Sequence, residues 1–554
     1  VFQCSWLSQK AAEQYEKQLT FYGNRGTIYD ANHMEMACSI NVTSIAVSPQ
    51  KIKNKAAASK WLAKTLKLKK KNLERKLRSK KPFVWIKRHI TPKETKAVRN
   101  FGLDGVIFVP ERCRFYPNRT LAAQVLGFSG IDGNGLEGIE FSYNSYLKGR
   151  AKNITVLKDA LGRRFDSEEK RGEDFSGKNV ILTIDRTIQY ITEKALEDAG
   201  KEFSAKSGIA IVMDPKTGAV LSLANYPFFN PNSFQKFDQK TWRNRAISDS
   251  FEPGSTMKIF LAAAALETGK IAPSTIFYCE NGSYKIGRNI VHDAHPYSWL
   301  SLQQIVKYSS NIGATKITEI MGKKTLYETL KRFGFGTKSG FDCPGETAGS
   351  LSSYRRWTKI DSSAISFGQG ISVSAIQLTT AASAIANQGI LMRPYIVRGI
   401  MDNDGNMIKR FRPCKVRRVV STRTANTVKR IMKTVITEGG TGINAAVDGY
   451  TVCGKTGTAQ KTDNKGKYAK GKYLASFIGF APAENPEIVI FVLIDEPKNM
   501  HYGGTVAAPV FGKIASETLN YLNLPLHRQE YCNIKDDSNG GRQFKTKTEN
   551  VKRG

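Results

Sequence analysis

A serine and a lysine three positions apart, Ser255 and Lys258, open an apolar helical stretch at residues 251–269. Residues i and i+3 lie on one face of a helix, so this spacing can bring the hydroxyl and the amine within hydrogen-bonding distance. A neutral amine in that position can accept the serine proton and make the serine a nucleophile. The spacing alone does not select this pair, because Ser-x-x-Lys also begins at four other serines, where we expect ordinary solvated helices: Ser48, Ser145, Ser167 and Ser233.

Two further signals follow the Ser255 helix in order along the chain. Ser309 and Asn311 form a Ser-x-Asn pair, and residues 455–458 read Lys-Thr-Gly-Thr. Each signal alone is weak, since Ser-x-Asn also begins at Ser39 and Ser142, and Lys-Thr-Gly recurs at Lys216 in what we interpret as a hairpin turn. The ordered set of three is far more specific, and it is typical of serine acyl-transfer sites.

The three signals predict one catalytic arrangement around Lys258. This lysine can act as a base only when it is neutral, and a second cation, Lys455, together with burial, would lower its pKa. The hydroxyl of Ser309 can bridge the two lysines and relay a proton. The amide of Asn311 can orient Lys258 and bind a backbone group of the substrate.

The strand expected at residues 455–458 supplies the substrate contacts. Its edge can pair with an extended peptide, while the hydroxyls of Thr456 and Thr458 bind a terminal carboxylate beside Gly457. The backbone N–H groups of Ser255 and Thr458 would form an oxyanion hole, in which each donor is typically worth about 3 to 4 kcal/mol.

Residues 449–456 also match the phosphate-binding pattern G-x-x-x-x-G-K-[ST]. That loop must follow a strand and begin a helix. Here Tyr450–Cys453 is itself strand-like, and residues 457–471 are typical of a flexible turn. The context therefore argues against a nucleotide-binding loop.

The elements that must position these residues fall into two domains. In the first, an amphipathic helical pattern covers residues 6–19, and a strand pair follows within residues 25–48. Residues 51–100 are rich in lysine with leucine at helical spacing, which favours a solvated helical face over a membrane or polyanion contact. Residues 102–149 indicate a compact α+β module, and the polar interval 162–179 is the expected boundary.

The second domain begins with a strand at residues 179–185, a helix and then a hairpin turning at residues 214–218. The chain is mostly helical from Ser255 to about residue 390. Strands are expected again at residues 449–454, 473–482 and 487–495. This order predicts an α/β layout with non-sequential strand pairing. From residue 527 the chain is polar and basic, which predicts a disordered tail.

Composition limits the remaining classes of function. The 554 residues carry a net charge of +36, which favours polyanionic partners, but no zinc-finger, heptad or RNA-binding signature accompanies it, so we expect no nucleic acid. The eight cysteines form no C-x-x-C pair and the six histidines are dispersed, which disfavours a metal site. No run of 18 apolar residues occurs, but the chain begins with Val, so an upstream membrane anchor stays open.

The chain resembles the class B penicillin-binding proteins, the monofunctional peptidoglycan D,D-transpeptidases, and its cell-division branch in particular. The resemblance rests on the segments RGTIYD, RFYP and GLEGIE in the first domain, and on FEPGSTMK, KYSSNIG, ISFGQG and CGKTGTAQK in the second. It implies an α+β pedestal domain at residues 1–175 and a tail at 527–554. Between them, residues 176–526 would adopt the α/β transpeptidase fold of penicillin-recognising serine acyltransferases, with an antiparallel sheet between helical layers.

The resemblance also implies a function. Ser255 would attack the penultimate D-Ala of a peptidoglycan stem peptide, and a neighbouring stem would resolve the acyl-enzyme, giving a cross-link at the septum. No cofactor is expected. The implied partners are stem peptides, the lipid-linked precursor, β-lactams, a glycan polymerase and other division proteins. The implied location is the outer side of the cytoplasmic membrane, through one N-terminal helix. Alternatives are a non-catalytic division scaffold, an elongation-type transpeptidase, and a β-lactam hydrolase or sensor.

Overall fold

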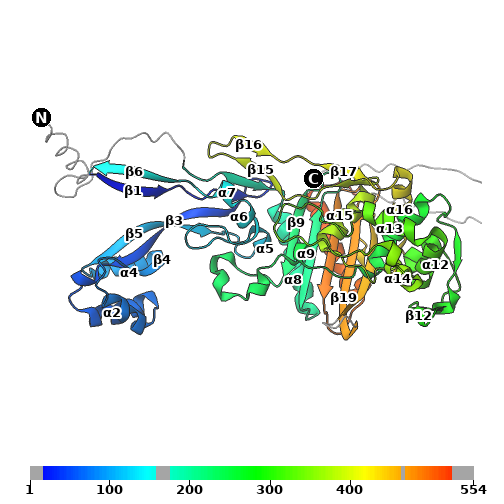
Figure 1. Ribbon diagram of the computed structural model, residues 1–554, viewed down its shortest axis with the longest axis horizontal. Helices are drawn as coiled ribbons and strands as arrows, with labels where there is room; N and C mark the ends of the chain where they lie inside the picture. Colours follow the sequence, from blue (N-terminus) through cyan, green and yellow to red (C-terminus); the bar gives the residue numbers. More distant parts are fainter. Residues whose placement is uncertain (1–15, 158–174, 463–467, 527–554) are drawn as a thin grey trace, which may run out of the picture.

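The computed structural model describes residues 16–157, 175–462 and 468–526. The molecule is elongated, with the N-terminal part drawn out into two strand-rich arms and the C-terminal part gathered around one sheet (Figure 1). Within the described ranges, no helix combines the length and the apolar character needed to cross a membrane.

The lower arm of the pedestal packs three helices against a twisted group of strands. The long strand β3 (Glu35–Val47) pairs with β4 (Val84–Ile90) and with β5 (Val106–Phe115). The helices α2 (Lys55–Leu66), α3 (Lys70–Leu77) and α4 (Pro92–Phe101) follow the short turn η1 (Pro49–Lys51) and cover these strands. The leucines of the lysine-rich stretch are buried in this small core, as their helical spacing predicts, and the lysines lie outside it.

In the upper arm, the prediction of a helix at residues 6–19 is wrong for the residues that the structure describes. Residues 16–22, part of the predicted amphipathic helix, form strand β1 (Glu16–Tyr22), which pairs along its whole length with β6 (Ala151–Leu157). The rest of the predicted helix, up to residue 15, lies outside the described residues. The paired residues are 129 to 141 positions apart in sequence, so a local periodicity could not reveal this pairing.

The root of the pedestal joins strands from distant parts of the chain. Strand β2 (Ile28–Tyr29) lies between β3 and β7 (Asn179–Leu182), and β7 pairs in turn with β15 (Val397–Met401), which pairs with β16 (Met407–Arg410). Three short helices cover this root: α5 (Ala123–Leu126), α6 (Gly138–Ser142) and α7 (Asn144–Leu147). The polar interval that predicts a domain boundary is therefore followed at once by a strand shared with the pedestal sheet.

The C-terminal part is built on a five-stranded antiparallel sheet with the order β18-β19-β20-β8-β9. Its members are β8 (Ser207–Met213), β9 (Val220–Tyr226), β18 (Cys453–Thr462), β19 (Tyr468–Ala481) and β20 (Ile488–Asp495). Helices α8 (Arg186–Glu202) and α18 (Ala508–Tyr521) pack on one face, whereas α10 (Lys258–Glu267) and α15 (Ala375–Ala386) lie on the other (Figure 1). An antiparallel sheet between helical layers is the predicted fold class.

The remaining elements complete the C-terminal part. The helices and turns are η2 (Pro231–Lys236), η3 (Gln239–Thr241), α9 (Arg245–Ser248), η4 (Gly254–Met257), η5 (Glu280–Gly282), α11 (Leu302–Tyr308), α12 (Asn311–Met321), α13 (Lys323–Arg332), η6 (Tyr354–Arg356), α14 (Lys359–Ser366), α16 (Thr422–Thr434), η7 (Ile443–Ala445) and α17 (Gly503–Val506). Of these, η7 and α17 lie in the core of the α8 and α18 face. The short strands are β10 (Ile276–Tyr278), β11 (Ser283–Ile286), β12 (Asn289–His292), β13 (Trp299–Ser301), β14 (Ile390–Met392) and β17 (Lys415–Arg418).

Three strand boundaries differ from the prediction. The strand expected at residues 449–454 begins only at Cys453, because Gly449 has a positive φ of 76° and an isolated bridge joins Val447 to Tyr450. The prediction of a turn over residues 457–471 is wrong at both ends, because β18 continues to Thr462 and β19, expected from residue 473, already begins at Tyr468. The hairpin predicted at residues 214–218 connects β8 to β9, as expected.

Candidate active site

Ser255 lies in the turn η4, one residue after the sharp bend that precedes helix α10. Gly254 has a φ of 55°, and its backbone lies so close to β18 that a Cβ would be 3.1 Å from the carbonyl oxygen of Thr458. Lys258 is the first residue of α10 and is fully buried. Its Nζ lies 2.9 Å from the Ser255 Oγ, so the predicted i, i+3 contact is present.

Neutral oxygens surround the amine of Lys258. It donates to the carbonyl oxygen of Ser309 at 2.8 Å, to Asn311 Oδ1 at 2.8 Å, and to Ser309 Oγ at 3.2 Å. Because burial disfavours the charged form, the pKa of Lys258 falls to about 7, although Asp293 acts in the opposite direction. A substantial fraction of this lysine is then neutral at physiological pH, as a base for serine requires.

A tight link between two helices aims Ser309 and Asn311 at this lysine. Helix α11 ends at Tyr308, Ser309 adopts a left-handed conformation with φ 63°, and α12 begins at Asn311. The side chain of Asn311 also donates to the carbonyl oxygen of His292 at 3.0 Å. The two predicted residues therefore reach Lys258 from a rigid corner rather than from a free loop.

Asp293 holds that corner in place, and it belongs to none of the three sequence motifs. Its carboxylate accepts hydrogen bonds from the backbone N–H groups of Asn311 and Ile312, the latter at 3.0 Å, and from the Ser310 hydroxyl at 2.5 Å. A lone aspartate in a loop carries no spacing signal, so only the fold reveals this contact.

Lys455 approaches the same hydroxyl from the sheet. Its Nζ lies 3.0 Å from Ser309 Oγ, so Ser309 bridges both lysines as predicted, and Lys455 is fully buried. Burial, together with repulsion from Lys258, lowers the pKa of Lys455 well below its ordinary value. The expectation that Lys455 lowers the pKa of Lys258 needs correction, because burial is the principal cause for both amines.

Strand β18, which carries the Lys-Thr-Gly-Thr sequence, is an edge strand with β19 as its sheet partner. Gly457 faces the Ser255 turn, where an added Cβ would lie 2.9 Å from Thr256 Cγ2 and 2.3 Å from Ser476 Oγ, so only glycine fits. Thr456 Oγ1 bonds to Thr441 Oγ1 at 3.0 Å. Thr458 Oγ1 accepts from the Gly503 N–H at 3.1 Å and keeps its own proton for a ligand.

The repeated motifs elsewhere do not assemble such a site. Lys216 lies in the turn between β8 and β9, as interpreted from the sequence. Lys455 lies within a strand and not at the start of a helix, which excludes the nucleotide-binding loop. In the described part of the chain, no group of three or more His, Cys, Asp or Glu side chains could hold a metal ion.

Comparison with known proteins gives one consistent result. A model of the penicillin-binding protein transpeptidase domain matches residues 208–516, and a model of the penicillin-binding protein dimerisation domain matches residues 20–182. The chain is similar to the probable peptidoglycan D,D-transpeptidase PenA of Neisseria meningitidis, with 36% identity over 526 residues, 94% of this chain and 88% of the relative.

Further relatives agree. The peptidoglycan D,D-transpeptidase FtsI of Escherichia coli is 32% identical over 509 residues, 90% of this chain and 84% of the relative. Stage V sporulation protein D of Bacillus subtilis is 34% identical over 530 residues, 94% and 81% of the two chains. Among solved structures, penicillin-binding protein 3 of Mycobacterium tuberculosis, complexed with aztreonam, aligns with a TM-score of 0.72 and 29% identity over 92% of this chain and 98% of that one.

Proposed function

Because the chain belongs to the class B penicillin-binding proteins and is a serine-type D,D-transpeptidase, we propose that it cross-links septal peptidoglycan through an acyl-enzyme on Ser255. The observation that carries this proposal is the buried amine of Lys258, whose pKa is about 7, at 2.9 Å from the Ser255 hydroxyl. A neutral amine at this distance is the general base that serine acylation needs.

In the proposed reaction, Lys258 accepts the Ser255 proton while Oγ attacks the carbonyl carbon of the penultimate D-Ala. The resulting oxyanion would be stabilised by the backbone N–H groups of Ser255 and Thr458. The C–N bond then breaks, the leaving D-Ala amine receives the proton, and an acyl-enzyme forms. The amine of a second stem peptide attacks this ester and completes the cross-link. Penicillin would acylate Ser255 in the same way, but no leaving amine departs.

The other site residues have supporting roles in this scheme. Ser309, 3.2 Å from Lys258 and 3.0 Å from Lys455, would relay the proton between the base and the leaving group. Asn311 would orient Lys258. The edge of β18 would pair with the donor peptide, and the hydroxyls of Thr456 and Thr458 would bind its terminal carboxylate.

Labelling with a fluorescent penicillin tests the assignment of the nucleophile. The parent protein should become covalently labelled, and Ser255→Ala should carry no label while keeping the parent thermal transition. Ser233→Ala is a matched control, because Ser233 also precedes a lysine by three positions, Lys236, but lies outside the site. Persistent labelling of Ser255→Ala would refute the proposal.

The septal role rests on similarity to FtsI of Escherichia coli and to the other relatives. As part of the same proposal, we place the catalytic domain outside the cytoplasmic membrane, attached by an N-terminal helix and close to a glycan polymerase and other division proteins. The experiment is replacement of the natural copy by Ser255→Ala. A transpeptidase of the septum should leave cells that form filaments, whereas normal division would favour the scaffold alternative.

A further inference from the structure

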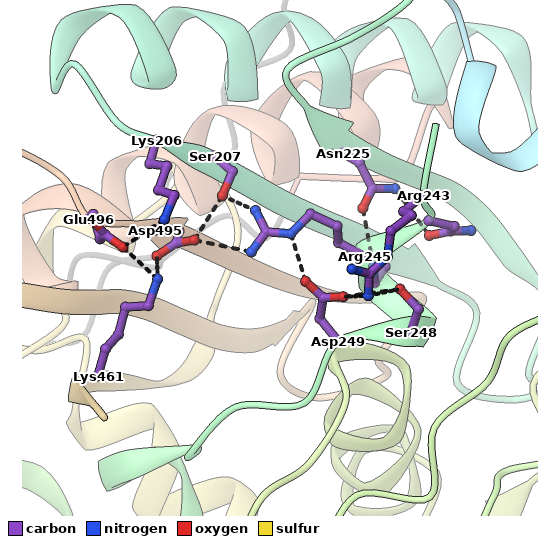
Figure 2. A network of polar contacts seen from close by, with 12 residues as sticks. Lys206, Ser207, Asn225, Arg243, Arg245, Ser248, Asp249, Lys461, Asp495 and Glu496 are labelled. Carbon is purple, nitrogen blue, oxygen red and sulfur yellow. Dashed lines mark hydrogen bonds and ion pairs between the residues drawn. The ribbon is translucent and has the colours of Figure 1, made fainter. Parts of the chain in front are cut away.

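A network of charged side chains lies at the end of the central sheet, away from the residues assigned above (Figure 2). At its centre is Asp495, the last residue of β20, whose side chain is only 1% exposed. The carboxylate accepts hydrogen bonds from Lys461 Nζ at 2.7 Å, Ser207 Oγ at 2.9 Å and Arg245 Nη2 at 3.1 Å. One buried carboxylate therefore links β18, β8 and α9.

The alternation of side chains along strands puts this network on the same face of the sheet as the catalytic lysines. Ala459 lies four residues after Lys455 in the regular part of β18, and an even separation means the same face. Across the sheet, Ala459 pairs with Leu474 of β19, and Leu474 pairs with Asp495. The Lys461 side chain therefore passes beneath β19 to reach β20.

Lys461 also lies where the backbone support of β18 becomes irregular. The β18–β19 register is continuous from Cys453 to Gln460 and shifts between Gln460 and Thr462. Thr462 pairs again with Tyr468 after this shift, and Lys461 itself has no strand partner in the β18–β19 register. Thr458, whose N–H would complete the oxyanion hole, is three residues before Lys461, a separation of about 10 Å along a strand.

A second contact links the same hairpin to the turn that carries the nucleophile. The hydroxyl of Tyr468, the first residue of β19, bonds to Glu252 Oε2 at 3.2 Å, and Glu252 Oε1 accepts from the Gly370 N–H at 2.8 Å. Glu252 precedes Ser255 by three residues. Lys461 therefore links this hairpin to β20 and to Glu496 directly after it, through ion pairs with Asp495 and Glu496, and the hydrogen bond from Tyr468 to Glu252 links the hairpin to the serine loop.

We propose that Lys461, through its contact with Asp495, is a positioning residue that fixes the edge strand β18 for acylation of Ser255. The inference rests on the proposed function and adds a residue to it. Loss of the Lys461 amine leaves Asp495 bonded to Arg245 and Ser207, so the carboxylate is still compensated and the sheet still folds. The end of β18 would then move relative to Ser255, and a misplacement of about 1 Å can cost a factor of about 100 in rate.

The test compares Lys461→Met with Lys461→Arg and with Lys472→Met. Arginine keeps a charged donor for Asp495, whereas Lys472 is an exposed lysine of the same hairpin and serves as the control. Penicillin acylation is resolved into the first-order rate constant and the dissociation constant of the initial complex, at several pH values, beside the thermal transition.

We expect Lys461→Met to lower the first-order rate constant by about 10- to 100-fold. The pH at which the rate is half-maximal should stay at the parent value, because Lys258 and its surroundings are unchanged. Lys461→Arg and Lys472→Met should acylate like the parent.

Two results would overturn the proposal. One is a parent-like rate constant for Lys461→Met, whatever its thermal stability, because the contact would then be structural only. The other is a shifted pH profile, because Lys461 would then act on the charge of the base. If Lys461→Met does not fold, Lys461→Gln takes its place with the same criteria. Absence of any label on the parent protein would instead refute the proposed function itself.

Discussion

Two pairs of buried cations within the described residues differ in what surrounds them. At the root of the pedestal, Arg25 and Arg114 bond to the carboxylate of Glu140, with Nε–Oε distances of 2.5 and 2.6 Å, and the Glu140 side chain is fully buried. At the active site, Lys258 and Lys455 share the hydroxyl of Ser309. Each amine donates its hydrogen bonds to neutral oxygens.

The pKa of a buried group shifts in a direction that depends on the charges around that group. Burial alone would raise the pKa of Glu140, but the two arginines overcome this and keep it below its ordinary value, so the cluster stays charged. Burial outweighs the charge of Asp293, which acts to raise the pKa of Lys258, and this pKa falls to about 7. Asp293 is nearby, but its oxygens are occupied by Ser310, Asn311 and Ile312. The charged cluster around Glu140 links parts of the fold, whereas the buried lysines have the property that the proposed function requires of a base.

The largest expected effect comes from removing the base. Lys258→Ala should lower the rate of penicillin acylation by about 10²- to 10⁴-fold, the usual contribution of a general base. The fold should persist, since the substitution removes a buried amine and leaves the apolar body of α10 intact. Stopped-flow acylation and circular dichroism provide the measurement. A folded variant that acylates at the parent rate would show that Lys258 is not the base.

Removing the charge of Glu140 should have the opposite effect to Lys258→Ala: it should lower stability and leave acylation unchanged. Glu140→Gln leaves two buried arginines without a counter-charge, and breaking a buried ion pair costs about 3 to 5 kcal/mol of unfolding free energy. Denaturant unfolding measures this loss, with Glu137→Gln, an exposed neighbour, as the control. The protein that remains folded should acylate like the parent. Equal stability of the two variants would contradict the structural role given to Glu140.

Local patterns predicted an α/β layout and the ordered site motifs, and the family resemblance implied the antiparallel sheet between helical layers. Ser255 and Lys258 meet within one helical turn, and Gly254 and Gly457 lie where backbones approach closely. The order of the motifs then selected one Ser-x-x-Lys pair from five, and the structure brings that pair to Ser309 and Lys455.

What the sequence did not predict depends on contacts between distant segments. Strand β1 pairs with residues near 155, so its helical periodicity was misleading. Asp293 and Asp495 are single carboxylates without a motif, and each acquires its role from donors on other elements. The pKa of Lys258 is also a property of the packed site, because it depends on how completely the fold removes water from the amine.

The most direct test of the central claim is the pH dependence of penicillin acylation of Ser255. Only the neutral amine of Lys258 can accept the serine proton, so the rate should rise with pH through one ionisation near the pKa of about 7 and level off above it. Lys258→Ala should lose this ionisation from its residual rate. A parent rate that stays flat between about pH 6 and 9, or that rises only near the ordinary lysine pKa of about 10.4, would contradict the account.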